Sequence, residues 1–268
     1  MRMGNLFSLS NVSVVRDGKR ILGPMDLSVD EGESIAIIGR NGSGKTTLSM
    51  LLKREISPYY DKLAHSSMTI LGRSDWDIFE LRRTVVSVST DDERFFDPCK
   101  TVGEVILSGM FGSDGIYPIH EVTRDMAGRM YGLMDAVDLR VQPDRGFGTL
   151  SQGERRSAMI ARALMPGPKV VILDEPTNSL DPVASTMFIR MIDGLIGKGI
   201  SVVMVTHRLE DIPKGIGRVI GIRGGIIVAD GRKEDVLTSQ HVSEIYGADV
   251  KVVHEGGMYA LSVDSENL

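Results

Sequence analysis

Several features are scarce or absent in this 268-residue sequence, and each absence excludes a class of protein. Its one cysteine, Cys99, excludes an internal disulfide framework and is typical of a reducing cytosol. Acidic residues (36) outnumber basic ones (31), and the net charge of −5 provides no electrostatic footprint for nucleic acid. No apolar run approaches the ~20 residues that cross a bilayer, and residues 1–5 lack the apolar segment of a secretory signal. We therefore expect a cytoplasmic protein that reaches a membrane only through a partner.

The sequence does contain a glycine-rich loop at residues 39–46, GRNGSGKT, directly after the apolar run 35–38. The loop fits the pattern GxxxxGK(S/T), and a short buried strand before it is the context in which this pattern binds phosphate. The glycines let backbone N–H groups converge on an anion without a Cβ in the way. Lys45 would reach the β- and γ-phosphates, and Thr46 would place its hydroxyl on Mg²⁺. The alternative is a glycine turn followed by an ordinary surface lysine.

The order of the predicted elements indicates an α/β fold. Two strands, 6–15 and 21–29, precede the loop and predict a small antiparallel β layer beside the nucleotide. Apolar runs then alternate with helical patterns, which predicts a parallel sheet with its site at the carboxyl ends of the strands. These runs lie at 35–38, 85–89, 170–173 and 201–205. We expect one domain over residues 1–268, with a helical subdomain at about 98–164 and a C-terminal extension of hairpins and a helix at about 218–268.

Helical periodicity is clearest in the subdomain. Thr101 and Glu104 have the spacing of a capping box. An apolar stripe at helical spacing follows, formed by Met126, Met130, Leu133, Met134 and Val137. We interpret its methionines as core, although methionine also serves on adaptable surfaces that bind partners. Further helices are expected around 187–196 and over 232–246.

Three polar residues follow buried strands downstream of the loop. Asp174 ends the apolar run 170–173 and has the position of the carboxylate that holds Mg²⁺ in loop-type NTPases. Glu175 would orient or deprotonate the attacking water, since a carboxylate beside the γ-phosphate can accept its proton. His207 leaves another strand and would hydrogen-bond the γ-phosphate. Each has an ordinary alternative as a polar residue at a strand end, but their joint occurrence in this order favours the nucleotide interpretation.

Ser151 and Glu154 form a second capping box, ahead of a helix that we expect to end near Leu164. Such a cap needs no function by itself. A helix N-terminus that exposes the Ser151 hydroxyl and the Gly153 amide is, however, also an anion site.

With this segment the sequence resembles the ATP-binding cassette (ABC) ATPases. Five motifs carry the resemblance in the family's order and cover nearly the whole chain. They are the phosphate loop 39–46, the signature 150–154 (LSQGE), the carboxylate strand 170–175, the turn 179–181 (SLD) and His207. The resemblance implies a head-to-tail dimer with two ATP molecules, each held between one copy's phosphate loop and the other copy's signature. It further implies that ATP closes the dimer and that hydrolysis reopens it.

The resemblance also implies roles for individual residues. Catalysis falls to Lys45, Glu175 and His207, and Mg²⁺ to Thr46 and Asp174. Asp91 is our own hypothesised Mg²⁺ ligand, in place of a glutamine that the family usually has. ATP is bound on the loop side by Arg16, Gly39, Asn41, Gly42, Ser43, Gly44, Lys45, Thr46 and Thr47. On the signature side it is bound by Ser151, Gly153 and Glu154, while Ser179 and Asp181 carry contacts between the two sites.

Three positions depart from the family's pattern. The glutamine that usually follows the strand 85–89 is Thr90, a shorter residue, so we hypothesise that Asp91 or a bridging water replaces its contact with Mg²⁺ or the attacking water. The aromatic residue that usually stacks on adenine aligns near Arg16, whose guanidinium can also stack on a π face. One glycine of the signature is replaced by Gln152.

The leading hypothesis for function is the ATPase subunit of a membrane transporter, docked on separate permease subunits at the inner face of the membrane. A single cassette without a fused membrane domain resembles importers. The segment 101–117, which contains LSGMFG at 107–112, resembles the ATPases of metal-chelate and related cofactor importers. The tail 237–263, which contains IYG at 245–247, resembles them too. The alternative is a soluble ABC ATPase of an assembly system, such as iron–sulfur cluster biogenesis. A regulatory subunit that hydrolyses poorly is suggested only by Thr90, and the intact catalytic residues argue against it.

Overall fold

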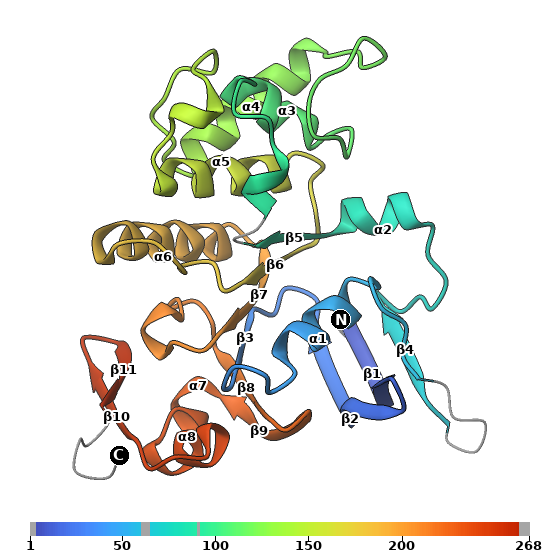
Figure 1. Ribbon diagram of the computed structural model, residues 1–268, viewed down its shortest axis with the longest axis vertical. Helices are drawn as coiled ribbons and strands as arrows, with labels where there is room; N and C mark the ends of the chain where they lie inside the picture. Colours follow the sequence, from blue (N-terminus) through green and yellow to red (C-terminus); the bar gives the residue numbers. More distant parts are fainter. Residues whose placement is uncertain (1–3, 60–64, 90–91, 263–268) are drawn as a thin grey trace. The chain divides into compact units, whose positions relative to one another are not determined.

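The computed structural model describes residues 4–59, 65–89 and 92–262 (Figure 1). The chain forms two compact units, one made of Met1–Asp77 and Ser201–Leu268 and the other of Ile78–Ile200. We call the first the loop unit, because it contains the glycine-rich loop, and the second the helical unit. The expected division into one domain with a subdomain and a C-terminal extension stays a prediction.

The loop unit begins with an antiparallel sheet in the strand order β2-β1-β4. β1 (Asn5–Arg16) and β2 (Lys19–Asp30) are joined by a tight turn in which Asp17 and Gly18 have φ values of 51° and 74°. β4 (Ser67–Ile70) pairs with β1 on its other edge. The predicted antiparallel layer is therefore confirmed.

The second sheet of the loop unit holds the strand that leads into the glycine-rich loop. β3 (Ile35–Ile38) lies between β7 (Ser201–Thr206) and β8 (Arg218–Arg223), and the three strands run parallel. β9 (Ile226–Arg232) returns antiparallel to β8. Every residue of β3 is 0% exposed, as expected for an uninterrupted apolar strand that is covered on both faces. The loop follows β3 and leads into α1 (Lys45–Leu52).

The C-terminal part of the loop unit departs from the sequence expectation at one point. Residues 232–246 form two helices, α7 (Lys233–Val236) and α8 (Ser239–Tyr246), instead of one. The break falls at Thr238, whose hydroxyl accepts a hydrogen bond from the His241 N–H and caps α8. Threonine favours such a cap because its oxygen satisfies an N–H that has no partner inside the helix.

Both predicted C-terminal hairpins are present. β8 and β9 form the first, with Gly224 and Gly225 at its turn, where their φ values are 58° and 80°. β10 (Lys251–Glu255) and β11 (Met258–Ser262) form the second.

The helical unit contains a parallel pair of strands and a helix on either side of it in sequence. β5 (Val85–Ser89) pairs with β6 (Val170–Asp174). α2 (Ile78–Thr84), directly before β5, is not predicted by the sequence, because Leu81 is its one buried residue and no apolar stripe marks it. α6 (Pro182–Gly197) follows β6.

α6 begins earlier than the expected start near Met187. The Asp181 carboxylate accepts hydrogen bonds from two backbone N–H groups of its first turn. Pro182 fits the first helical position because it has no N–H to leave unpaired. The helical unit also contains the 3-10 turns η1 (Asp92–Phe95) and η2 (Phe147–Thr149), and the loop unit contains η3 (Leu209–Asp211).

The remaining helices of this unit are α3 (Val102–Ser108), α4 (Arg124–Ala136) and α5 (Gln152–Leu164). Both predicted capping boxes are confirmed, at the starts of α3 and α5. Met130 and Met134 of α4 are 4% and 5% exposed, which confirms the core interpretation for these two methionines.

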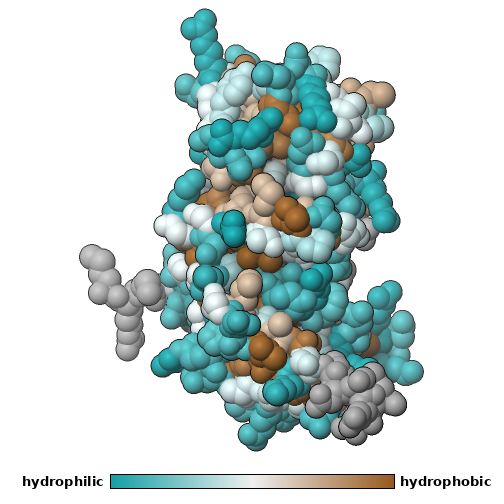
Figure 2. Space-filling view, turned by 90° about the vertical axis from the view of Figure 1, so that its left-hand side faces the viewer, coloured by the Kyte–Doolittle hydropathy of each residue, from teal (hydrophilic) through white to brown (hydrophobic). Residues whose placement is uncertain are grey.

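The surface matches the composition of the sequence. Among the described residues, no helix combines the length and the apolar character that a membrane crossing requires. The face in Figure 2 is mostly hydrophilic, and its hydrophobic residues form separate small patches. Scattered apolar residues of this kind are normal on a protein surface and mark no site by themselves.

Candidate nucleotide-binding site

The glycine-rich loop follows a backbone path that excludes other residues at two positions. Gly39 has a φ of 154°, and a Cβ there would lie 2.3 Å from the Ile222 carbonyl oxygen. Gly44 has a φ of 109°, and its Cβ would lie 3.1 Å from Leu22 Cδ1. Only glycine accepts such φ values without strain. The loop can therefore lie directly against β2 and β8, with its backbone exposed to a ligand.

The turn between β8 and β9 holds the loop in place. The Gly225 N–H donates a hydrogen bond of 2.8 Å to the Ser43 carbonyl. The Gly225 carbonyl in turn accepts one of 2.7 Å from the Gly23 N–H. One main-chain hydrogen bond from the distant β8–β9 turn, which is itself bonded to β2, thus holds the middle of the loop and reduces the ordering that ligand binding would require.

Lys45 lies beneath the loop. Lys45 is 5% exposed, and its Nζ donates hydrogen bonds to the carbonyls of Gly39 at 2.8 Å and Arg40 at 3.2 Å. A buried ammonium is costly, and its retention at the start of α1 suits a site that binds negative charge. Lys45 is therefore not an ordinary surface lysine.

Two further features of the loop fit a bound anion. Ser43 Oγ is buried, and no described residue provides a hydrogen-bond partner for it. α1 starts at Gly44 without a capping side chain. By contrast, α3, α4, α5, α6 and α8 each have one. The first N–H groups of a helix need partners and favour negative charge, so these residues fit the phosphates of a nucleotide.

The other loop-side candidates are accessible. Asn41 and Thr46 are exposed, and Thr47 is half-buried in the first turn of α1. Arg16, the last residue of β1, is exposed in the same unit. The contact of its guanidinium with adenine stays a prediction.

His207 leaves the sheet at the same edge as the loop. It follows β7, and Thr206 at the end of β7 pairs with Ile38 at the end of β3. The His207 carbonyl accepts a 2.7 Å hydrogen bond from Tyr246 Oη. The carbonyl of Tyr246 accepts a 3.3 Å hydrogen bond from Arg40 Nη1 in the loop. The loop unit thus brings His207 and the phosphate loop together, as the positions of these residues at strand ends predict.

The predicted carboxylates lie in the helical unit. Asp174 is the last residue of β6 and pairs with Ser89 of β5. Glu175 follows it with a φ of 47°, and Ser179 has a φ of 70°. A left-handed backbone at a residue other than glycine costs on the order of 1 kcal/mol and is frequent at functional sites. Asp91, the hypothesised substitute ligand, lies outside the described residues, as does Thr90.

The signature segment forms the start of α5 in the same unit. The Glu154 N–H donates to Ser151 Oγ at 3.2 Å, and the Ser151 N–H donates to Glu154 Oε2 at 2.7 Å. The second of these bonds lowers the pKa of the Glu154 carboxyl. Arg145 Nη1 donates to the other oxygen of Glu154 at 3.2 Å. Ser151, Gly153 and Glu154 also line a hollow of about 220 Å³ that reaches α6. The first turn of α5 is therefore held rigidly.

Local sequence patterns miss three features of these regions. Gly225 is predicted as a turn residue, but its contact with the loop is not predictable from the turn alone. Tyr246 lies in the importer-like segment 245–247 without a predicted role. Arg156 of α5 would pass for a surface charge, yet it is 1% exposed and its Nε lies 3.2 Å from Glu93 Oε1.

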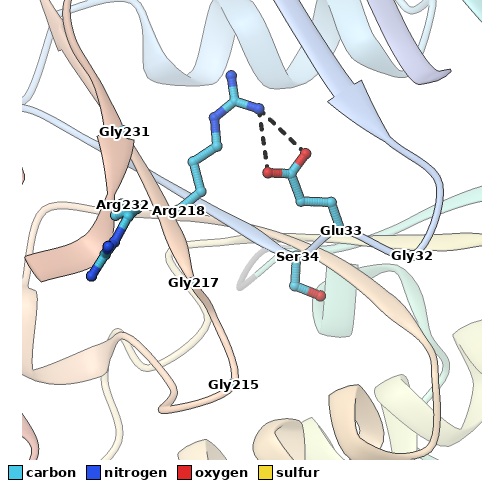
Figure 3. A pocket seen from close by; sticks show the side chains of 8 residues that line it. All are labelled: Gly32, Glu33, Ser34, Gly215, Gly217, Arg218, Gly231 and Arg232. Atoms are coloured by element: carbon cyan, nitrogen blue, oxygen red, sulfur yellow. Dashed lines mark hydrogen bonds and ion pairs between the residues drawn. The ribbon is translucent and has the colours of Figure 1, made fainter. Parts of the chain in front are cut away.

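A hollow of about 550 Å³ lies elsewhere in the loop unit, next to the amino-terminal ends of β3 and β8 (Figure 3). Arg218 lines it and forms ion pairs with Glu33 at 3.3 Å and Asp230 at 2.6 Å. The hydrogen bond to Asp230 raises the pKa of Arg218. Because two carboxylates already engage this guanidinium, we do not assign the nucleotide to this hollow.

A buried strand, a glycine loop over a buried lysine and a helix without a side-chain cap define a phosphate-loop nucleotide-binding protein. A family model described as "ABC transporter" matches residues 22–178, and the chain belongs to this family of ATP-binding proteins. The chain is therefore an ATPase with the predicted α/β fold of the P-loop NTPases in its ABC form.

Three relatives show how far the similarity extends. An uncharacterised ABC transporter ATP-binding protein, YlmA of Bacillus subtilis (strain 168), is 33% identical over 255 residues, which is 92% of this chain and 93% of the relative. Phosphonates import ATP-binding protein PhnC 2 of Synechococcus sp. (strain JA-2-3B'a(2-13)) is 31% identical over 87% of this chain and 86% of its own. Hemin import ATP-binding protein HmuV of Rhizobium meliloti (strain 1021) is 29% identical over 91% and 92%.

A solved structure supports the fold. The ADP conformation of an ATP-binding cassette from an ABC transporter superposes with a TM-score of 0.77 at 25% identity. The match covers 90% of this chain and 98% of that cassette. The similarity thus extends well beyond the segment that the family model matches.

Proposed function

We propose that the protein is the ATP-hydrolysing subunit of an importer, in which two copies close around two ATP molecules and drive a separate membrane permease. Relatives of nearly the same length are named as import ATP-binding proteins, for phosphonates and for hemin. ATP binding is supported by one observation: the glycine loop lies over buried Lys45, and Ser43 Oγ has no hydrogen-bond partner among the described residues. The proposed action on a membrane permease rests on the names of the relatives.

In this proposal the residues of the phosphate loop bind the phosphates of ATP, and the residues at the strand ends act on the γ-phosphate. Lys45 and the N–H groups at the start of α1 bind the phosphates, because both present positive charge to the inside of the loop. Thr46 and Asp174 would hold Mg²⁺, which when bound offsets the charge that develops on the transferred phosphoryl group. Glu175 orients the attacking water and accepts its proton, and His207 contacts the γ-phosphate.

The second copy would complete each site through its signature. Ser151 is exposed at the start of α5, and Gly153 lies in the first turn of that helix. These groups suit a phosphate that arrives from outside the chain, since a helix N-terminus favours an anion. One copy therefore lacks a complete site, and ATP is hydrolysed only when two copies associate.

Glu175→Gln tests the catalytic assignment. Glutamine keeps the size of the side chain but cannot accept the proton, so we expect turnover to fall by a factor on the order of 10² or more. ATP binding should persist, and the variant should elute as an ATP-dependent dimer in size-exclusion chromatography. Glu121→Gln, at an exposed glutamate of the same unit, is the control and should keep normal turnover. Normal turnover in Glu175→Gln would refute the role of Glu175.

The permease and the import direction need a separate test. We propose an inner-face location on a permease, with a metal chelate or related cofactor as the transported substrate, as the hemin-importing relative suggests. Purification from native membranes in mild detergent should recover a stoichiometric polytopic membrane protein. A substrate-binding component in the same complex would support import. Recovery only from the cytosol with scaffold proteins would refute the transporter proposal in favour of an assembly ATPase.

A further inference from the structure

The end of α8 connects the two parts of the nucleotide site that lie in the loop unit. Tyr246 is the last residue of α8, and its hydroxyl donates a 2.7 Å hydrogen bond to the carbonyl of His207. Its own carbonyl accepts a hydrogen bond from Arg40 Nη1 at 3.3 Å. One residue thus contacts the main chain that bears His207 and a side chain of the phosphate loop.

The position of Tyr246 is fixed by the strand next to β3. Ile245 is 1% exposed and packs so closely on Gly221 of β8 that a Cβ at Gly221 would lie 2.4 Å from Ile245 Cδ1. Arg223 at the end of β8 donates a 2.9 Å hydrogen bond from Nη1 to the Glu244 carbonyl. β8 also supplies Ile222, whose carbonyl lies against Gly39 in the phosphate loop. The same strand therefore supports the loop and the end of α8.

α8 ends at Tyr246, the residue that contacts His207. Gly247 adopts the left-handed conformation, with a φ of 61°, and closes the helix directly after Tyr246. A left-handed glycine is a common helix end because it lets the last carbonyls find partners. Here the chain turns away after Tyr246, and the tyrosine ring remains beside the end of β7.

We propose that Tyr246 is a positioning residue for His207: its hydroxyl holds the His207 peptide at a set place relative to the phosphate loop. The inference rests on the proposed contact of His207 with the γ-phosphate. A side chain that must meet a phosphate oxygen needs its backbone fixed to within a fraction of an ångström, because small displacements weaken a charge-assisted hydrogen bond. His207 directly follows the last residue of β7, and the Tyr246 hydroxyl donates a hydrogen bond to its carbonyl there.

The proposal predicts a specific kinetic pattern in Tyr246→Phe. The substitution removes the hydroxyl and keeps the ring, so the hydrogen bond between the Tyr246 carbonyl and Arg40 remains available. We expect kcat to fall about fivefold, the effect of losing one ordinary hydrogen bond in the transition state. KM for ATP and the affinity for a non-hydrolysable ATP analogue should stay unchanged, because the loop itself is not altered. Tyr131→Phe, at an exposed tyrosine of α4, is the matched control and should behave as the unmodified protein.

A second measurement follows His207 directly. In protein labelled with ¹⁵N-histidine, the imidazole resonances of His207, assigned by their loss in His207→Ala, should shift in Tyr246→Phe and not in Tyr131→Phe. A thermal melt of each variant shows that the chain is folded. A shift of the His207 resonances with a reduced kcat supports the positioning role.

Four outcomes would overturn the inference. Unchanged kcat and unchanged His207 resonances would show that the hydroxyl positions nothing. A parallel loss of ATP-analogue affinity and kcat would show general support of the loop instead. If His207→Ala lowers turnover and Tyr246→Phe does not, only this inference fails. If His207→Ala itself turns over normally, the proposed role of His207 fails, and the inference fails with it.

Discussion

Gly221 in β8 offers a direct test of how firmly α8 is held. A Cβ at this position would lie 2.4 Å from Cδ1 and 2.5 Å from Cγ1 of Ile245, whose side chain is fully buried. Gly221 has no positive φ, so its backbone accepts alanine without strain. In the folded state, the substitution Gly221→Ala therefore reports on packing and not on backbone strain.

The expected magnitude follows from two opposing terms. Forcing an additional methyl group into a filled core costs about 1–3 kcal/mol. Replacement of glycine by alanine restricts the unfolded chain and recovers about 0.4–1 kcal/mol. We therefore expect Gly221→Ala to lower the free energy of unfolding by about 1–2 kcal/mol. Ile245→Ala alone should lower it by about 2–5 kcal/mol, because it leaves a cavity.

The double variant distinguishes close packing from a general effect. In Gly221→Ala with Ile245→Ala, the new methyl group occupies part of the cavity and no longer meets Cδ1 or Cγ1. The combined loss should be smaller than the sum of the two single losses by about 1–2 kcal/mol, a size typical of residues in contact.

Urea and thermal unfolding of the four proteins provide the measurement. Gly217→Ala is the control, since a Cβ at Gly217 meets no heavy atom within 4 Å. It should be neutral or slightly stabilising. A neutral Gly221→Ala would show that α8 moves away from β8 at no cost. Strictly additive losses would show that the new methyl group does not meet Ile245. Either result would refute the reasoning that β8 fixes the end of α8.

Three further predictions test the loop, the signature helix and the charged hollow. Lys45→Ala should raise the Kd for ATP at least about tenfold, which is the effect of losing one charge-assisted hydrogen bond. Lys251 is exposed, and Lys251→Ala should leave the Kd unchanged in the same titration. Glu154 has a lowered pKa in the folded protein, so the stability that its carboxylate contributes is present above its ordinary value of 4.5 and is lost as the pH falls through the folded pKa. Between pH 6 and pH 3, the melting temperature of Glu154→Gln should accordingly fall less than that of the unmodified protein. An equal fall in the two proteins would contradict this prediction. Arg218→Met should lower the free energy of unfolding by about 1–2 kcal/mol, because two carboxylates lose their donor. Arg140→Met removes an exposed ion pair with Asp138 and should leave the midpoint of the same urea titration unchanged, because water screens such a pair.

The phosphate loop was predictable because its backbone is determined by neighbours in the sequence. The positive φ values of Gly42 and Gly44 agree with the order of the residues in segment 39–46, because glycine adopts them without strain. The same holds for the capping box of Ser151 and Glu154, in which the partners are three residues apart. Contacts of this kind need no knowledge of the rest of the chain.

Elements with weak local signals were missed or misplaced. α2 has one buried residue, Leu81, and therefore no apolar stripe that would predict a helix. The interruption between α7 and α8 depends on whether Thr238 continues the helix or caps the next one, and both are compatible with its residue type. The burial of Arg156 beside Glu93 could not be predicted, since arginine in the first half of a helix is usually exposed.

The class of site, the strand that leads into it and the family can all be inferred from the sequence, because spacing within short segments fixes backbone conformation and chemistry together. The contacts that support the loop, in contrast, form only in the folded chain. Gly225 donates a hydrogen bond to Ser43, and the carbonyl of Ile222 packs against Gly39. Tyr246 donates a hydrogen bond to the carbonyl of His207. These partners are far apart along the chain. Their residue types, glycine, isoleucine and tyrosine, occur throughout the sequence without such roles, and the fold alone selects which of them lie beside the nucleotide loop.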